Sequence, residues 1–263
     1  MSKYRMIFIF LGIMLGCFPL FSAPRRKVNQ GKANFSKSFQ TKWGNRSITV
    51  RQEYSNSKIE GDFPSSGIAE KCAKRFYETL DYLPEELIKK TRLKYVTFLR
   101  NLKLNGQPAA GIASGSTIFL RVDFSAKTVY HEFFHIFDPQ RNDKKWQALN
   151  EKDFIYTGSD FYKVDMTAKE RRQSKRNKRK SDITKSFVSE YAMSFEHEDR
   201  AETFAFMITE GKAFLKRAKN PVIKAKMEYI MELFISRNLL DQSFWDKHFD
   251  SKFKVKNRFY QTR

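Results

Sequence analysis

The stretch Val129–Phe137 constrains the fold and the chemistry of this chain more than any other. It reads VYHEFFHIF and places His131 four residues before His135. On an α-helix this spacing puts both imidazoles on one face, about one turn apart, where both can bind a single metal ion. Glu132 then lies beside the ion without binding it, the position of the general base in H-E-x-x-H zinc helices. The stretch therefore predicts a catalytic zinc-binding helix, and the alternatives are a structural metal site or a catalytically inactive relative.

A second helical segment can complete such a site. A catalytic zinc ion takes three protein ligands and leaves a fourth position open, so a further ligand must come from elsewhere in the chain. In Phe195–Ile208 the apolar spacing is helical, and Glu198 and Glu202 share one face. Such a pair can present a metal ligand and a supporting carboxylate together. His197 is the rival ligand, although no carboxylate lies four residues after it.

The two segments together carry a family resemblance. His131–His135 (HEFFH) followed by Glu198–Glu202 (EDRAE) resembles the gluzincin metallopeptidases, and most of all the bacterial zinc-binding metallopeptidases related to anthrax lethal factor. The resemblance covers roughly Thr117–Gly211 and implies a zincin fold with a bound Zn2+. It also implies residue roles: His131, His135 and Glu198 as zinc ligands, Glu132 as general base, and Glu202 as support for a ligating histidine. Lethal factor carries a tyrosine two helical turns before its ligand glutamate, and Tyr191 has that spacing here.

Tyr191 is the candidate for stabilising a transition state. It lies seven residues before Glu198, so on a helical path it can reach the metal from the same side. A phenol O–H directed at the substrate carbonyl oxygen stabilises that oxygen as negative charge develops on it. The alternative is a buried tyrosine of the core with a structural hydrogen-bond partner.

The expected fold class is α+β: a zincin-like domain with a small mixed sheet, an edge strand over the HExxH helix and a C-terminal helical part. The edge strand is expected near Thr117–Val122, where an extended peptide could pair with it, and the alternative is that this segment is an ordinary interior strand. Ser125 is predicted to cap the HExxH helix, and Asp138-Pro139 to end it. The other local predictions are strands at Ile48–Val50 and Tyr95–Leu99, a loop at Gly61–Gly67, a turn at Asn105-Gly106, helices at Ile68–Leu80, Pro221–Asn238 and near Phe244, an N-cap at Ser194 and a C-cap at Gly211.

The N-terminus predicts export. Met1–Ala23 has basic residues, then an apolar run, then small residues, which is the pattern of a signal peptide. Leu15-Gly16-Cys17 also resembles a lipobox, so cleavage after Ala23 and lipidation at Cys17 are equal alternatives. Either route makes the protein extracytoplasmic, secreted or lipid-anchored at a bacterial surface or periplasm. Residues 24–44 are expected to form a flexible leader and residues 45–263 a single catalytic domain.

The charge of the chain predicts anionic partners without choosing among them. Its 50 Lys and Arg against 29 Asp and Glu give a net charge of +21. Lys169–Lys180 carries eight basic residues and one acidic residue, and is expected as an insertion that either binds an anionic surface or polymer or is merely solvated. No aromatic residue interrupts it, so specific nucleic-acid recognition is not expected.

These patterns lead to two functional hypotheses. The first is a zinc metallopeptidase, which hydrolyses peptide bonds with a metal-activated water and Glu132 as general base. The second is a non-catalytic zincin-like surface protein that binds anionic partners through its basic face. A peptide or protein substrate is implied by the first hypothesis only.

Overall fold

The computed structural model describes residues 47–152, 154–158 and 185–250. The expected signal peptide, the leader and the Lys169–Lys180 insertion lie outside the described residues. Within these ranges no helix is both long and apolar enough to cross a membrane. The described chain is α+β, as expected, with a small mixed sheet and a set of helices.

The sheet is built around one long central strand, β3. Its strands run in the order β1-β3-β6-β5, with β1 and β6 parallel to β3 and β5 antiparallel to β6. β2 and β4 pair antiparallel with the C-terminal half of β3. The strand bounds are β1 Thr49–Val50, β2 Ile59–Asp62, β3 Tyr95–Leu104, β4 Gln107–Pro108, β5 Gly111–Ser114 and β6 Thr117–Arg121.

The prediction of the edge strand was wrong. β6, which covers Thr117–Arg121, lies inside the sheet between β3 and β5, and β5 forms the edge of the described sheet. The physical reason is that Ile118, Phe119 and Leu120 are all buried, at 0%, 4% and 0% exposure, as in a strand covered on both faces. The predicted loop Gly61–Gly67 was also wrong at both ends, because Gly61 and Asp62 belong to β2 and Ser66 and Gly67 belong to α2.

The helices follow the capping signals closely, with one exception. Ser125 Oγ accepts a hydrogen bond of 3.1 Å from Thr128 N at the start of α4, which confirms the predicted cap. The predicted N-cap Ser194 was wrong: its Oγ donates to Tyr191 O over 2.6 Å, and Phe195 is the residue before α8. The bounds are α2 Ser66–Leu80, α3 Glu85–Lys89, α4 Ala126–Phe137, α5 Lys144–Gln147, η2 Tyr191–Met193, α8 Glu196–Glu210, η3 Gly211–Ala213, α9 Phe214–Arg217, α10 Pro221–Ile235 and α11 Gln242–Phe249.

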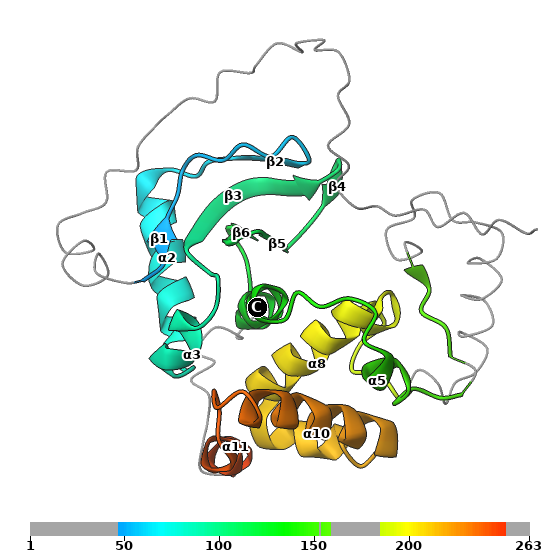
Figure 1. The fold of residues 1–263 in the computed structure, drawn as a ribbon. Coiled ribbons are helices and arrows are strands. Elements are labelled where there is room, and N and C mark those ends of the chain that lie inside the picture. Colours follow the sequence, from blue (N-terminus) through cyan, green and yellow to red (C-terminus); the bar gives the residue numbers. More distant parts are fainter. Residues whose placement is uncertain (1–46, 153, 159–184, 251–263) are drawn as a thin grey trace, which may run out of the picture. The chain divides into compact units, whose positions relative to one another are not determined.

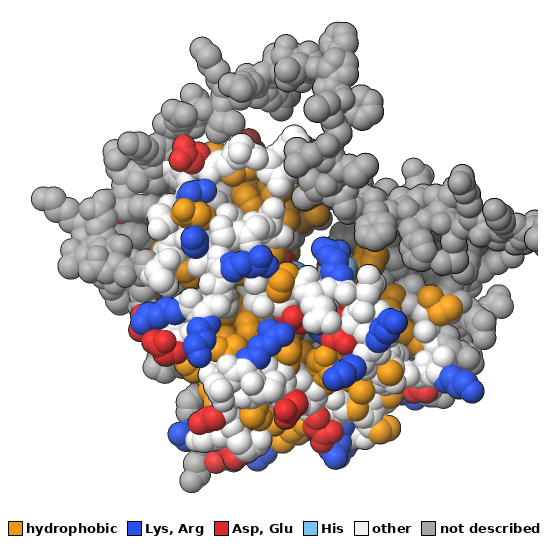
Figure 2. Space-filling view, viewed as in Figure 1, with side chains coloured by type: hydrophobic (Ala, Val, Ile, Leu, Met, Phe, Trp, Pro, Cys, Tyr) orange, Lys and Arg blue, Asp and Glu red, His pale blue; other side chains and the backbone are white. Residues whose placement is uncertain are grey.

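Charged side chains are mixed on the face of the molecule that Figure 2 draws. Lys and Arg side chains are spread over its described part, and Asp and Glu side chains lie among them. No part of this view gathers basic residues alone into one patch among the described residues. The described residues hold 27 Lys and Arg against 24 Asp and Glu, so only +3 of the net charge of +21 belongs to them.

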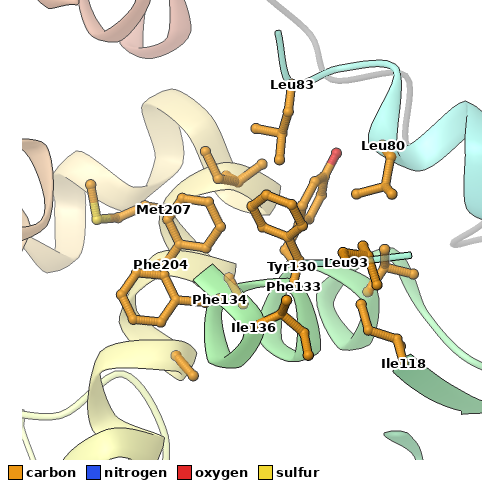
Figure 3. Close-up of a cluster of buried hydrophobic side chains, with 14 of the residues drawn as sticks. Leu80, Leu83, Leu93, Ile118, Tyr130, Phe133, Phe134, Ile136, Phe204 and Met207 are labelled. Atoms are coloured by element: carbon orange, nitrogen blue, oxygen red, sulfur yellow. The ribbon is translucent and has the colours of Figure 1, made fainter. Parts of the chain in front are cut away.

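The core surrounds α4, which lies between the sheet and α8 (Figure 1). Its apolar residues point into a cluster that also takes side chains from α2, β6 and α8 (Figure 3). The rings of Phe134 and Phe204, for example, have centroids 5.1 Å apart and join α4 to α8. Burial on several sides leaves α4 little freedom to move, so the histidines that it carries are held in place.

A buried arginine fixes α8 against the C-terminal end of α4. Arg200 is 1% exposed, and its Nη1 donates to Oδ2 of Asp138, the residue after α4. Its Nε lies 2.8 Å from Oε1 of Glu196 in the first turn of α8. A buried charge with such partners is costly to leave unpaired, so this network holds the two helices in one relative position.

Candidate metal centre

Three predicted ligands from two helices converge on one point. His131 and His135 come from α4, Glu198 comes from α8, and their ligand atoms all lie within 4.8 Å of one another. His131 Nε2 and His135 Nε2 are 3.1 Å apart. Oε2 of Glu198 lies 3.0 Å from the first and 3.1 Å from the second. The three atoms therefore form a nearly equilateral triangle.

This triangle fits a zinc ion. In a tetrahedral site with zinc–ligand distances of about 2.0–2.1 Å, neighbouring ligand atoms lie about 3.3 Å apart. Two imidazole nitrogens and one carboxylate oxygen are also a donor set that zinc accepts in catalytic sites. With three protein ligands, a fourth position stays open for water or substrate.

A second carboxylate orients one of the histidines. Nδ1 of His131 lies 3.0 Å from Oε1 of Glu202, one turn after Glu198 on α8. Oε2 of Glu202 accepts a 2.7 Å hydrogen bond from Ser189 Oγ and lies 3.6 Å from Lys127 Nζ. Such a partner leaves Nε2 of the imidazole available to a metal.

Electrostatics inside the cluster favour an anionic carboxylate. Burial raises the pKa of Glu198, but His135, His131 and His197 together outweigh burial and hold that pKa well below its usual value. Burial lowers the pKa of His131, but its hydrogen bonds to Glu198 and Glu202 raise that pKa to about 10. A cluster with this much negative charge around two imidazoles is prepared to receive a cation.

Glu132 sits between the centre and the edge strand β5. It is 6% exposed, and burial raises its pKa to about 7, with the backbone amide of Ala113 opposing that rise. A Cβ on Gly111 would lie 2.7 Å from Cγ and 2.8 Å from Oε1 of Glu132, closer than real Cβ atoms come to other atoms. The absence of a side chain at Gly111 therefore makes room for this carboxylate. A base with a pKa near neutrality is suited to accept and return a proton.

Tyr191 lies next to the metal centre, on a different local structure from the expected one. It begins the short 3₁₀ helix η2, and the chain leaves helical conformation before α8 starts at Glu196. Its ring centroid is 5.7 Å from that of His131, and its side chain is partly exposed. The tyrosine therefore lies beside His131, one of the candidate ligands.

His197, the rival ligand, lies beside the triangle without being part of it. Its Nε2 is 3.4 Å from Oε1 of Glu198, the oxygen that faces away from the triangle, and its ring stacks on Phe195 at 5.4 Å. It contacts the ligand carboxylate and is not one of the three converging ligand residues.

Sequence reasoning missed Ser189, Lys127, Gly111 and Ala113. Their roles depend on contacts across the fold, and a serine or glycine outside a motif carries no signal of its own. Only the position of Gly111, at the start of an apolar strand pattern, hinted at a close approach of backbone to another group.

The described chain is an α+β domain in which three side chains from two helices could hold one metal ion. The chain belongs to a family described as "Putative zinc-binding metallo-peptidase", whose profile matches residues 111–251, more than half of its length. The fold is similar to the crystal structure of a zinc-binding metallo-peptidase, described as putative, from Bacteroides caccae ATCC 43185. The TM-score is 0.52 at 16% sequence identity, covering 81% of this chain and 90% of the other. No curated protein shows significant similarity to the chain.

Proposed function

We propose that this protein is a zinc-dependent peptidase that acts outside the cytoplasm. The observation that carries the proposal is the convergence of His131 Nε2, His135 Nε2 and Glu198 Oε2 beside a buried glutamate. Structural zinc sites are closed by four protein ligands, whereas three ligands leave a position for chemistry. Membership in a zinc-binding family supports the choice of metal.

Zinc bound here would supply Lewis acidity toward a carbonyl oxygen and toward a water molecule. Glu132 accepts the proton of the attacking water and delivers it to the leaving amine. Its placement against Gly111 and Ala113 keeps the carboxylate in one orientation between the centre and β5. Tyr191 donates its phenol O–H to the carbonyl oxygen of the scissile bond as negative charge develops there.

The substrate backbone pairs with the edge strand β5. Arg121 N donates to Ala110 O over 2.9 Å, and the register continues as Gly111 with Leu120. In an antiparallel ladder, alternate residues point their N–H and C=O groups outward. Gly111 and Ala113 therefore direct backbone groups to the edge beside Glu132. The Ala113 N–H already binds Glu132, so an extended peptide can add a strand through the Ala113 carbonyl and the backbone groups of Gly111.

The extracytoplasmic location rests on the signal pattern of Met1–Ala23, and the kinship with anthrax lethal factor rests on the HEFFH and EDRAE segments. The alternative function, binding of an anionic partner without catalysis, rests on the net charge of +21 and on Lys169–Lys180. The metal centre favours the peptidase, because a purely electrostatic binding surface needs no buried general base.

The test is a peptidase assay on denatured protein substrates with zinc-loaded wild type and Glu132→Ala. Wild type should cleave, and the variant should lose cleavage while it keeps zinc. A peptidase function is contradicted if neither protein cleaves, or if both cleave equally. Zinc content of each preparation is the control that separates a lost base from a lost metal.

A further inference from the structure

A cavity of about 490 Å³ lies between the segment after α4 and the start of α8. Half of its lining residues contribute rings or an aliphatic side chain, namely Phe154, Tyr156, Phe195, His197 and Ile155. The other half are polar or charged, namely Arg141, Asn142, Gln147, Asn150 and Glu196. The volume falls within the range of about 300–1,000 Å³ that is usual for ligand pockets. A cavity with this lining has room for an aromatic ring, which can pack against the rings of the wall and keep polar neighbours at its edge.

The cavity adjoins the metal centre through His197. This residue lines the cavity, its Nε2 is 3.4 Å from Oε1 of Glu198, and its ring centroid is 5.7 Å from that of His135. Two of the three candidate zinc ligands are thus in contact with a residue of the cavity wall. A group held in the cavity is close to whatever is bound at the metal.

The charges of the lining favour an uncharged occupant. Arg141 and Glu196 are of opposite sign, and Glu196 is already engaged by Asn142 N at 2.9 Å and by Arg200. A charged side chain would therefore gain one attraction and meet one repulsion, in addition to losing its hydration. An aromatic ring gains apolar burial and edge contacts with the rings of the wall.

Ile155 supplies an apolar contact at the rim of the cavity. Among the described residues, three large hydrophobic side chains are exposed, and Ile155 is the most exposed of them at 53%. It is also the one that lines this cavity. A group that enters the cavity would bury part of this side chain and gain an apolar contact at the rim.

We propose that this cavity receives an aromatic side chain of the peptide substrate, at a position adjacent to the scissile bond. The inference rests on the proposed peptidase function and names its substrate class: peptides with Phe, Tyr or Trp beside the cleaved bond. Ile155 and Phe195 then act as specificity-determining residues, since they line the cavity and are absent from the metal triangle.

Binding is tested with zinc-loaded Glu132→Gln, which binds peptide without needing to turn it over. The probes are capped hexapeptides of serine and alanine that carry one Phe, one Leu, one Glu or a further Ala, titrated by calorimetry. The Phe peptide should bind about tenfold or more tightly than the Ala peptide, and about threefold to tenfold more tightly than the Leu peptide. Equal affinities for all four probes would overturn the inference.

Two substitutions in this background locate the preference. Ile155→Asp should abolish most of the preference for Phe, because it places a charge at the rim without disturbing the core. The matched control is Ile68→Asp, since Ile68 is also exposed, at 40%, and lines none of the pockets described. Phe195→Leu should reduce the discrimination between Phe and Leu. If the preference for the Phe peptide is unchanged in Ile155→Asp, the aromatic side chain binds outside this cavity and the inference is wrong.

Cleavage gives the second readout. Wild type is incubated with a peptide mixture from denatured proteins, and the new termini are sequenced. Aromatic residues should be enriched at one position next to the bond, and the enrichment should fall in Ile155→Asp but not in Ile68→Asp. Cleavage without aromatic enrichment overturns the inference about the cavity but leaves the proposed peptidase function intact. Absence of cleavage contradicts the proposed function, and the binding assay then decides whether the cavity takes an aromatic side chain.

Discussion

Glu202 holds His131 by a contact of 3.0 Å between Oε1 and Nδ1. A carboxylate at this distance accepts the Nδ1 proton, which leaves Nε2, directed at His135 and Glu198, as the nitrogen that can bind a metal. The contact joins α8 to α4, so the orientation of one candidate ligand is set by the helix that supplies another.

Glu202→Gln should weaken zinc binding by about tenfold to a hundredfold. The amide is uncharged and can turn its NH2 group toward His131, which favours the wrong tautomer. Zinc affinity is measured by competition with a chromophoric chelator. Glu210→Gln is the control, because Glu210 lies on the same helix and pairs with Arg217 away from the ligands. Equal zinc affinity of wild type and Glu202→Gln would show that the contact does not tune the metal.

Tyr191→Phe should lower kcat by about a hundredfold or more, because one hydrogen-bond donor to the developing oxyanion is removed while the ring remains. Zinc content and the unfolding midpoint should stay at wild-type values. Steady-state kinetics on one cleaved peptide provide the measurement. An unchanged kcat, or a loss that follows lost zinc or lost stability, makes Tyr191 a structural residue.

Gly111→Ala should lower activity while zinc stays bound. The added Cβ would lie 2.7 Å from Glu132 Cγ and 2.8 Å from Thr128 Cγ2, so the carboxylate must move. A displacement of a catalytic group by about 1 Å can cost about a hundredfold in rate. Gly67→Ala is the control, since a Cβ there meets nothing within 4 Å. Wild-type activity in Gly111→Ala would mean that the position of Glu132 is less constrained than its contacts indicate.

The stability of the C-terminal helix α11 should fall in mild acid. Burial lowers the pKa of His248 below 6.5, although its bond to Met207 O opposes that shift. Tyr82 OH contacts the other ring nitrogen. The unfolded chain therefore binds a proton that the folded chain does not, and stability is lost as pH falls below about 6.5, by up to about 1.4 kcal/mol per pH unit.

His248→Gln tests this prediction, because glutamine cannot titrate there. The free energy of unfolding by urea is measured for both proteins at pH 7.5 and 5.5. Wild type should lose more stability than the variant between the two values, while the contributions of the other histidines cancel in the comparison. Equal losses would show that His248 titrates alike in the folded and unfolded chains.

Local signals in the sequence predicted local structure well. Ser125 caps α4 because a serine oxygen can reach the backbone two or three residues on, which depends on no other part of the fold. Asn105 and Gly106 both take positive φ values, 51° and 77°, in the turn between β3 and β4. The i and i+4 spacings of the two motif helices likewise predicted which side chains could share a face.

Relations between distant elements were harder to predict. Thr117–Arg121 looks like a strand from its own residues, but its place inside the sheet depends on β5, whose four residues carry little pattern. Ser189 binds Glu202 only because η2 turns back toward α8. Such contacts are set by tertiary packing, and single-residue propensities do not encode it.

The claim on which everything else depends is that α4 and α8 together bind one zinc ion. Metal analysis of the purified protein after dialysis should give about one zinc per chain for wild type and for His197→Ala, whose side chain lies outside the triangle. The double variant His131→Ala, His135→Ala should retain almost none, and Glu198→Ala should bind zinc much more weakly. Full zinc occupancy in the double variant would contradict the assignment of this centre.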